Sequence, residues 1–118
     1  MKHNRVGLKY AISGFYSALK TEHNIKVHFV IMFITLFAGL LFGLSRLEWL
    51  FVLLAIGLVL ALELVNTVIE LITDVLFEDK HEKAKLIKDI SAAAVLVAAT
   101  FAALVGIIIF LPKILGLF

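Results

Sequence analysis

Four polar side chains recur on one face of an otherwise apolar stretch in the middle of the chain. They are Glu63, Asn66, Glu70 and Asp74, spaced by three, four and four residues. At about 100° per residue, this spacing places them within an arc of about 80° on a helix, so they form one polar stripe. An acidic side chain near the centre of a bilayer costs roughly 2.5 to 3.5 kcal/mol, so such a stripe predicts a functional site.

The depth of each stripe residue follows from the rise of a helix. If the helix begins at Trp49, a rise of about 1.5 Å per residue puts Glu63 about 21 Å and Glu70 about 31 Å along it. Glu63 then lies within the cytoplasmic third of the membrane, and Glu70 lies near the interface. Asp74 lies beyond the interface, within reach of water. A gradient from buried to hydrated carboxylates suits a reaction that joins a lipid to a soluble cofactor.

Two more polar clusters are expected at the level of the stripe. Glu22 and Asn24 precede the first apolar stretch, and Lys88 and Asp89 precede the last one. Carboxylate oxygens suit Mg²⁺, which usually takes one or two protein carboxylates and completes its octahedron with phosphates and water. A lysine beside them can hold a phosphate as a point charge. The sequence contains no GxxxxGK[ST], which excludes a P-loop NTPase, and His28 is interpreted as a structural residue.

The composition indicates which elements position these residues. Of 118 residues, 63% are apolar and 17% are charged, which is far more apolar than an ordinary soluble domain. Three predominantly apolar stretches are long enough to cross a hydrocarbon core about 30 Å thick; the first and last are uncharged, and the second continues past residues 49–62 into the polar stripe. The sequence therefore predicts an all-α membrane protein in a single domain, 1–118. Its predicted segments are a surface helix over 1–24 and membrane spans over 26–45, 49–77 and 89–111.

The segment before the first span is predicted to be an amphipathic helix. Leu8, Ile12, Phe15 and Leu19 fall on one face, and the segment is too charged to cross the membrane, so it should lie in the interface. Five Lys and Arg residues lie before the first span or at its first residue, and four lie between the second and third spans. The positive-inside rule then predicts a multi-pass cell-membrane protein with a cytoplasmic N-terminus. A net charge of +2 does not indicate nucleic-acid binding, and zero cysteines exclude thiolate chemistry.

The last span carries a stripe of small residues. Ala94, Ala98, Ala102 and Gly106 recur at every fourth position, which favours close helix packing. Such a stripe needs a partner, so a homo-oligomer is the natural inference, although periodicity does not give its number. Pro112 is expected to end the helix.

The residues alone leave other interpretations open. A proton-coupled small transporter also uses a membrane glutamate, but its site would lie near the midplane, whereas these acidic groups run to the interface. A structural oligomer or pore former leaves the polar stripe unexplained. Lys88 is equally typical of a residue that snorkels to the interface. Asp74 and Glu78 are typical of a solvated helix end.

Two segments together resemble a known family. Leu62–Asp74, LELVNTVIELITD, resembles the ExxN(S/T)xxExxxD signature of small bacterial diacylglycerol and undecaprenol kinases. Lys88–Val95, KDISAAAV, resembles the segment that follows it, and the likeness covers nearly the whole chain. The resemblance implies an ATP- and Mg²⁺-dependent lipid kinase that acts as a homotrimer. Glu22–His28 is similar to the ExNxxxH form of undecaprenol kinases, so undecaprenol is the expected substrate and diacylglycerol the alternative.

The resemblance also implies a role for individual residues. Glu63 matches the catalytic carboxylate, which is expected to take the proton of the lipid hydroxyl. Glu22 and Glu70 match the residues associated with Mg²⁺ and ATP. Phosphoryl transfer asks for positioning, charge neutralisation and a proton acceptor, and this constellation offers all three. The positions expected to contact the nucleotide are Tyr10, Glu22, Asn66, Glu70, Asp79, Lys80, His81, Lys88 and Asp89.

Overall fold

The computed structural model describes residues 3–78 and 81–116, and over these residues the chain is helical apart from short turns. The helices, in chain order, are α1 (His3–Thr21), α2 (His23–Phe42), α3 (Arg46–Leu76) and α4 (Glu82–Ile114). This architecture confirms the predicted all-α class. Asp79 and Lys80, both expected at the nucleotide, lie outside the described residues.

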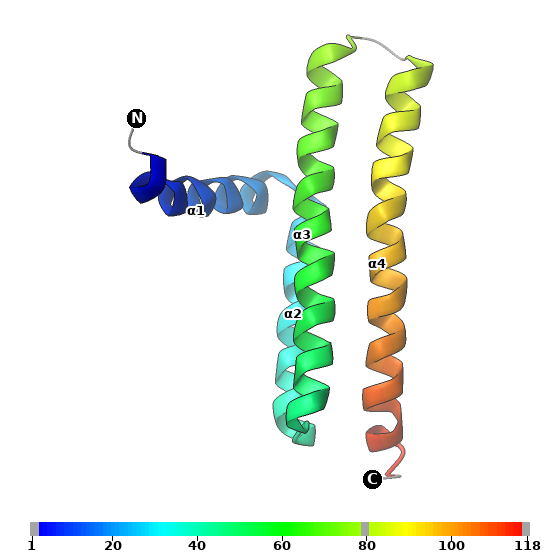
Figure 1. Cartoon of the computed structure of the whole chain (residues 1–118). Helices are drawn as coiled ribbons and strands as arrows, with labels where there is room; N and C mark the ends of the chain where they lie inside the picture. The colour runs from blue at the N-terminus through cyan, green and yellow to red at the C-terminus, as the bar shows by residue number, and fades with distance from the viewer. Residues whose placement is uncertain (1–2, 79–80, 117–118) are drawn as a thin grey trace.

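Three of the helices are long and apolar enough to cross a membrane, as the sequence predicts. α2, α3 and α4 contain 20, 31 and 33 residues. At about 1.5 Å per residue they are about 30, 46 and 50 Å long, so α3 and α4 exceed the thickness of a hydrocarbon core. In Figure 1, α3 and α4 run side by side and continue past the level at which α2 begins. Their connected ends therefore project beyond the level of α1.

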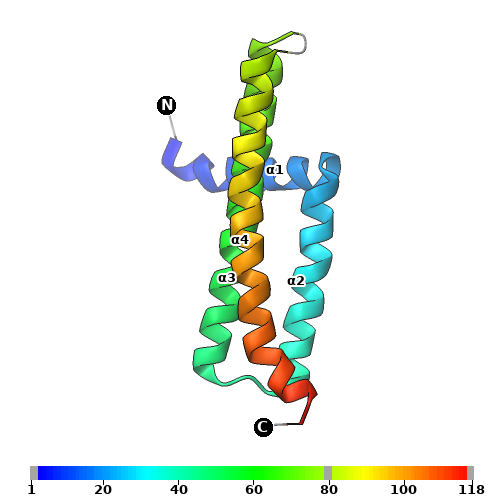
Figure 2. The same cartoon turned by 90° about the vertical axis from the view of Figure 1, so that its right-hand side faces the viewer.

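Helix α1 lies across the other three helices. Figures 1 and 2 show it roughly perpendicular to them, at the height where α2 starts. The ring of Phe15 on α1 packs against Phe29 on α2, with their centroids 5.2 Å apart. Leu8 and Ile12 on α1 are exposed. The placement of this helix in the membrane interface stays a prediction.

A tight turn joins α2 to α3. Gly43 ends α2 with a φ of 64°, a left-handed conformation that side chains disfavour. Ser45 and Glu48 then form a capping box, in which each side chain accepts a hydrogen bond from the backbone N–H of the other. Gly39 makes room for the indole of Trp49, because a Cβ there would lie 2.6 Å from a ring carbon. This turn sets α2 against α3 and so fixes which faces meet.

The most extensive packing surface lies between α3 and α4. Ala98 is 6% exposed, Ala102 and Gly106 are half-buried, and Ala94 is exposed. Small side chains let two helix backbones approach closely. Ala98 is therefore covered within its own chain, as expected for a stripe that packs against another helix. The homotrimer stays a prediction from the family resemblance.

The last helix continues past its proline. Pro112 lies inside α4, which ends at Ile114, so the prediction that Pro112 ends the helix is wrong. Proline removes one backbone N–H donor, but near the end of a helix few hydrogen bonds are lost. The last turn is also held by an ion pair between Lys113 Nζ and a carboxylate oxygen of Glu48 on α3, 3.3 Å apart. The end of α4 is therefore joined to the start of α3 by this ion pair.

Candidate functional site

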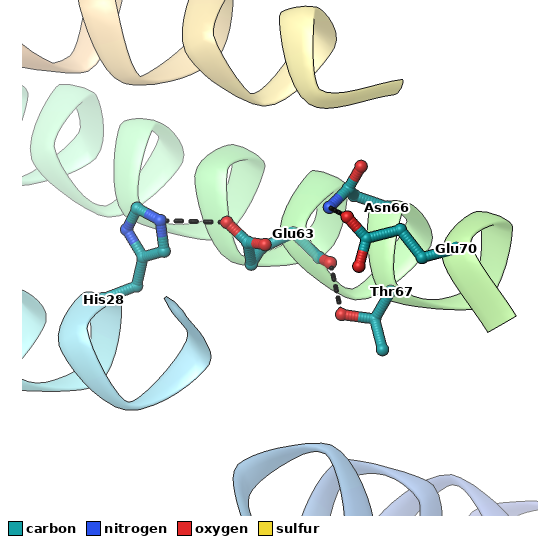
Figure 3. A network of polar contacts seen from close by, with 5 residues as sticks. All are labelled: His28, Glu63, Asn66, Thr67 and Glu70. Atoms are coloured by element: carbon teal, nitrogen blue, oxygen red, sulfur yellow. Dashed lines mark hydrogen bonds and ion pairs between the residues drawn. The ribbon is translucent and has the colours of Figure 1, made fainter. Parts of the chain in front are cut away.

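The Glu63 carboxylate is buried between helices. Its residue is 3% exposed, and its Oε2 lies 3.0 Å from Nε2 of His28 on α2. Figure 3 shows the imidazole of His28 pointing across the gap between the helices toward this carboxylate. One turn further along α3, the hydroxyl of Thr67 donates a hydrogen bond to the backbone carbonyl of Glu63 at 3.0 Å. The buried hydroxyl hydrogen of Thr67 is therefore paired. Within the described residues, the only ion-pair contact of the Glu63 carboxylate is the one between Oε2 and His28.

A second polar network links α4 to the same stripe. The hydroxyl of Ser91 on α4 donates to Oδ1 of Asn66 at 2.5 Å, and both residues are buried. Nδ2 of Asn66 in turn donates to Oε2 of Glu70 at 3.3 Å. Because its oxygen is taken by Ser91, the Asn66 amide must present its nitrogen to Glu70. Ser91 thereby orients the amide that holds the Glu70 carboxylate.

The projecting ends of α3 and α4 carry two ion pairs. Lys88 Nζ lies 2.5 Å from Oδ1 of Asp74, which joins the two helices. Lys85 Nζ lies 2.6 Å from Oδ2 of Asp89, one turn apart on α4. These pairs border a hollow of about 860 Å³. The hollow is lined by Asp74, Phe77, Glu78, His81, Glu82, Ala84, Lys85, Lys88 and Asp89.

His81 begins α4. Its Nδ1 accepts a hydrogen bond from the backbone N–H of Lys83 at 3.0 Å, so it caps the helix. Its ring also packs on Phe77, with centroids 4.8 Å apart. The structure therefore gives His81 a structural task at the rim of the hollow, and its contact with a nucleotide stays a prediction.

The predicted residues on the first two helices lie apart from these networks. Glu22 is half-buried at the start of α2 and its side chain makes no capping hydrogen bond. Tyr10 is 68% exposed on α1. Over the described part of the chain, no hydrogen bond or ion pair joins either side chain to the stripe. Both assignments therefore rest on the family resemblance.

The described residues do not form a protein-only metal cage. No group of three or more His, Asp or Glu side chains among them is close enough to hold a metal ion. Mg²⁺ does not require one, because it is usually bound by one or two carboxylates together with phosphates and water. Glu70 is half-buried, with one oxygen bonded to the Asn66 amide, so its other oxygen can serve a hydrated cation. The residues present fit Mg²⁺ bound together with a nucleotide.

An apolar cavity of about 320 Å³ lies between α2, α3 and α4. His28, which contacts Glu63, is the one ionisable residue among those that line it. The histidine therefore joins the buried carboxylate to the apolar space. The other lining residues are Ile31, Met32, Thr35, Val52, Ala55, Ile56, Val59, Leu60, Ala99, Ala102, Ala103, Val105, Gly106 and Phe110.

The structure brings two residues to the polar stripe that the sequence does not predict there. The sequence predicts a structural role for His28, although an ionisable side chain inside an apolar stretch is itself a signal of function. Ser91 carries no comparable signal, because serine is common in membrane helices. Its role becomes visible only when α4 is packed against α3.

The fold and the site define a class of protein: a membrane-spanning helical protein with carboxylates placed at the level where its first span begins. The family described as prokaryotic diacylglycerol kinase matches residues 9–110 of this chain. The chain is 38% identical to the undecaprenol kinase of Bacillus subtilis over 105 residues, which covers 89% of this chain and 85% of that protein. It is 35% identical to a diacylglycerol kinase of Synechocystis over 113 residues, covering 95% of this chain and 65% of that protein.

These similarities show the family. The chain belongs to the prokaryotic diacylglycerol kinases, and it is a kinase that acts on a lipid alcohol. Membership of a lipid kinase family explains the polar stripe, so the alternative functions of transporter and pore former are not needed to account for it.

Proposed function

We propose that the protein transfers the γ-phosphoryl group of ATP, with Mg²⁺, to the hydroxyl of undecaprenol at the cytoplasmic face of the membrane. The product is undecaprenyl phosphate. The similarity to the undecaprenol kinase of Bacillus subtilis supports this lipid over diacylglycerol. The observation that carries the proposal is the buried Glu63 carboxylate, which is 3% exposed and contacts His28, a residue that lines the apolar cavity.

In this proposal Glu63 is the general base. A lipid hydroxyl cannot travel far into water, so its base must meet it at bilayer depth. The O–H bond of the lipid breaks and its proton passes to the Glu63 carboxylate. The lipid oxygen bonds to the γ-phosphorus, and the bond from that phosphorus to the β,γ-bridging oxygen breaks to release ADP. General-base catalysis of this kind contributes about 10² to 10⁴ to a rate.

The apolar cavity is proposed to receive the part of the isoprenoid chain next to the hydroxyl. Its volume of about 320 Å³ is near the lower end of ligand sites, so it can hold only a section of a long chain. The remainder would run along the exposed apolar faces of the helices. His28 at one end of the cavity would place the hydroxyl beside Glu63.

The nucleotide is proposed to bind where the stripe reaches the hollow between α3 and α4. Lys88 would hold a phosphate, which would displace the Asp74 carboxylate. Breaking the pair between Lys88 and Asp74 costs little free energy, because the Asp74 side chain is 63% exposed and an exposed ion pair contributes only about 0 to 1 kcal/mol. Glu22 and Glu70 would hold Mg²⁺, which neutralises phosphate charge when bound. Tyr10, Asn66 and Asp89 would complete the contacts with ATP.

Orientation and assembly belong to the same proposal. The excess of basic residues before α2 and between α3 and α4 supports a cytoplasmic N-terminus. The connected ends of α3 and α4 would then project into the cytoplasm, where ATP is available. The family resemblance supports a homotrimer, in which exposed apolar faces of the helices would be partly covered by neighbouring subunits.

The test supplies purified protein with γ-labelled ATP, Mg²⁺ and one of three lipids in mixed micelles: undecaprenol, diacylglycerol or ceramide. The proposal expects label in undecaprenyl phosphate and loss of labelling when Mg²⁺ is chelated. Labelling of diacylglycerol in preference to undecaprenol would overturn the substrate and leave the mechanism standing. Absence of label in every lipid would overturn both.

A further inference from the structure

The contact between His28 and Glu63 does more than join two helices. Glu63 has a side chain that is 5% exposed, and the nearest donor to its carboxylate is Nε2 of His28, 3.0 Å from Oε2. A buried carboxylate is costly unless it accepts hydrogen bonds. An imidazole N–H supplies one such bond and, because the ring is rigid, also fixes where the bonded oxygen lies.

His28 lies between the polar stripe and the apolar cavity, because it contacts Glu63 and also lines the cavity. It lies on α2, whereas the polar stripe lies on α3, so the bond crosses from one span to another. It is also the ionisable residue in the lining of the cavity. A residue needed only for helix packing would be expected to be apolar at such a place, since the rest of the lining is apolar apart from Thr35. A close contact with one carboxylate oxygen at this junction points to control of the direction of the other oxygen.

We propose that His28 is a positioning residue for the general base. Its Nε2–H holds Oε2 of Glu63, so that Oε1 is directed at the hydroxyl of a lipid whose chain occupies the cavity. His28 exchanges no atom in the reaction, since the proton of the lipid hydroxyl goes to Glu63. The inference rests on the proposed function for the identity of the reaction. The contact itself rests on geometry alone.

The kinetic test is a double-mutant cycle between His28 and Glu63. His28→Leu removes the donor and should lower kcat about ten- to a hundred-fold, the effect of losing a hydrogen bond to a charged group, with the KM for ATP little changed. His28→Gln keeps an N–H donor and should stay within about threefold of the parent. In a Glu63→Gln background, His28→Leu should add almost nothing, because it acts through a base that is already absent.

A matched control is available on the same helix. His23 is exposed near the start of α2, and His23→Leu should leave kcat unchanged. If His28→Leu keeps normal turnover, or multiplies the loss in the Glu63→Gln background, His28 does not act through the base and the proposal is overturned. The cycle uses whichever lipid the parent protein phosphorylates, so a wrong substrate and a wrong role for His28 give different results.

A spectroscopic measurement tests the contact without any turnover. The chain has four histidines, and in protein labelled with ¹⁵N-histidine the signals of His28 are those that disappear in His28→Gln. The proposal expects a protonated Nε2 whose chemical shift changes in Glu63→Gln and stays in place in the control Glu82→Gln. Glu82 is an exposed carboxylate at the start of α4. A His28 signal that does not respond to Glu63→Gln would overturn the proposal.

Discussion

Removal of one hydroxyl, in Ser91→Ala, should disturb the site from a different helix. Ser91 and Asn66 are 8% and 5% exposed, and the bond between them is 2.5 Å long. Without the hydroxyl, Oδ1 of Asn66 is left buried without its donor, which should lower the free energy of unfolding by about 1 to 3 kcal/mol. The Asn66 amide is then free to turn, so its 3.3 Å bond to Glu70 is weakened.

The expected kinetic effect of Ser91→Ala follows from that second bond. A hydrogen bond contributes about 0.5 to 1.5 kcal/mol. Complete loss of the hydrogen bond from Asn66 to Glu70 should therefore lower kcat/KM for MgATP by about two- to tenfold. The assay varies ATP at saturating lipid and compares thermal unfolding in the same detergent. Ser13→Ala, at an exposed serine of α1, is the matched control. Normal stability together with normal ATP kinetics in Ser91→Ala would refute the network.

Three further substitutions test the metal ligand and the packing of the spans. Glu70→Gln should raise the Mg²⁺ concentration needed for half-maximal activity and weaken ATP binding while the fold stays intact, as judged by circular dichroism. Ala98→Phe, at a site that is 6% exposed, should lower the free energy of unfolding by about 1 to 3 kcal/mol, whereas Ala94→Phe at an exposed site should not. Gly39→Ala should destabilise similarly, because its Cβ would lie 2.6 Å from Trp49, and thermal unfolding measures both effects.

Each of these substitutions has an outcome that counts against the reasoning. Unchanged Mg²⁺ dependence in Glu70→Gln would remove that residue from the metal site. Unchanged melting of Ala98→Phe would mean that α3 and α4 do not pack closely there. A Gly39→Ala protein as stable as the parent would mean that the indole of Trp49 can move aside without loss.

The helices were predictable because the membrane imposes simple rules. An uncharged run of about 20 residues predicts a span whatever the rest of the chain does. The positions of the helix ends were less predictable, because they depend on local polar contacts. α4 begins at Glu82 under the cap of His81 rather than at the predicted position 89, and it continues through Pro112. The pattern of apolar residues along the sequence predicts neither the cap by His81 nor the ion pair between Lys113 and Glu48.

The site was predictable only where one helix carries it. Glu63, Asn66 and Glu70 share a face because of their spacing, and the structure buries Glu63 and Asn66 and half-buries Glu70. Contacts between helices have no such periodic signal. The pairing of His28 with Glu63 and of Ser91 with Asn66 depends on the register of three packed helices, which the sequence pattern does not encode.

The central claim is that Glu63 takes the proton of the lipid hydroxyl, and single-turnover transfer by Glu63→Gln tests it most directly. Glutamine keeps the size of the side chain and can still accept a hydrogen bond from His28, but it cannot accept the proton. The rate of transfer from bound ATP to the lipid should fall at least about 10²-fold, with ATP affinity and thermal stability retained. A Glu63→Gln protein that phosphorylates its lipid at a near-normal rate would contradict the claim.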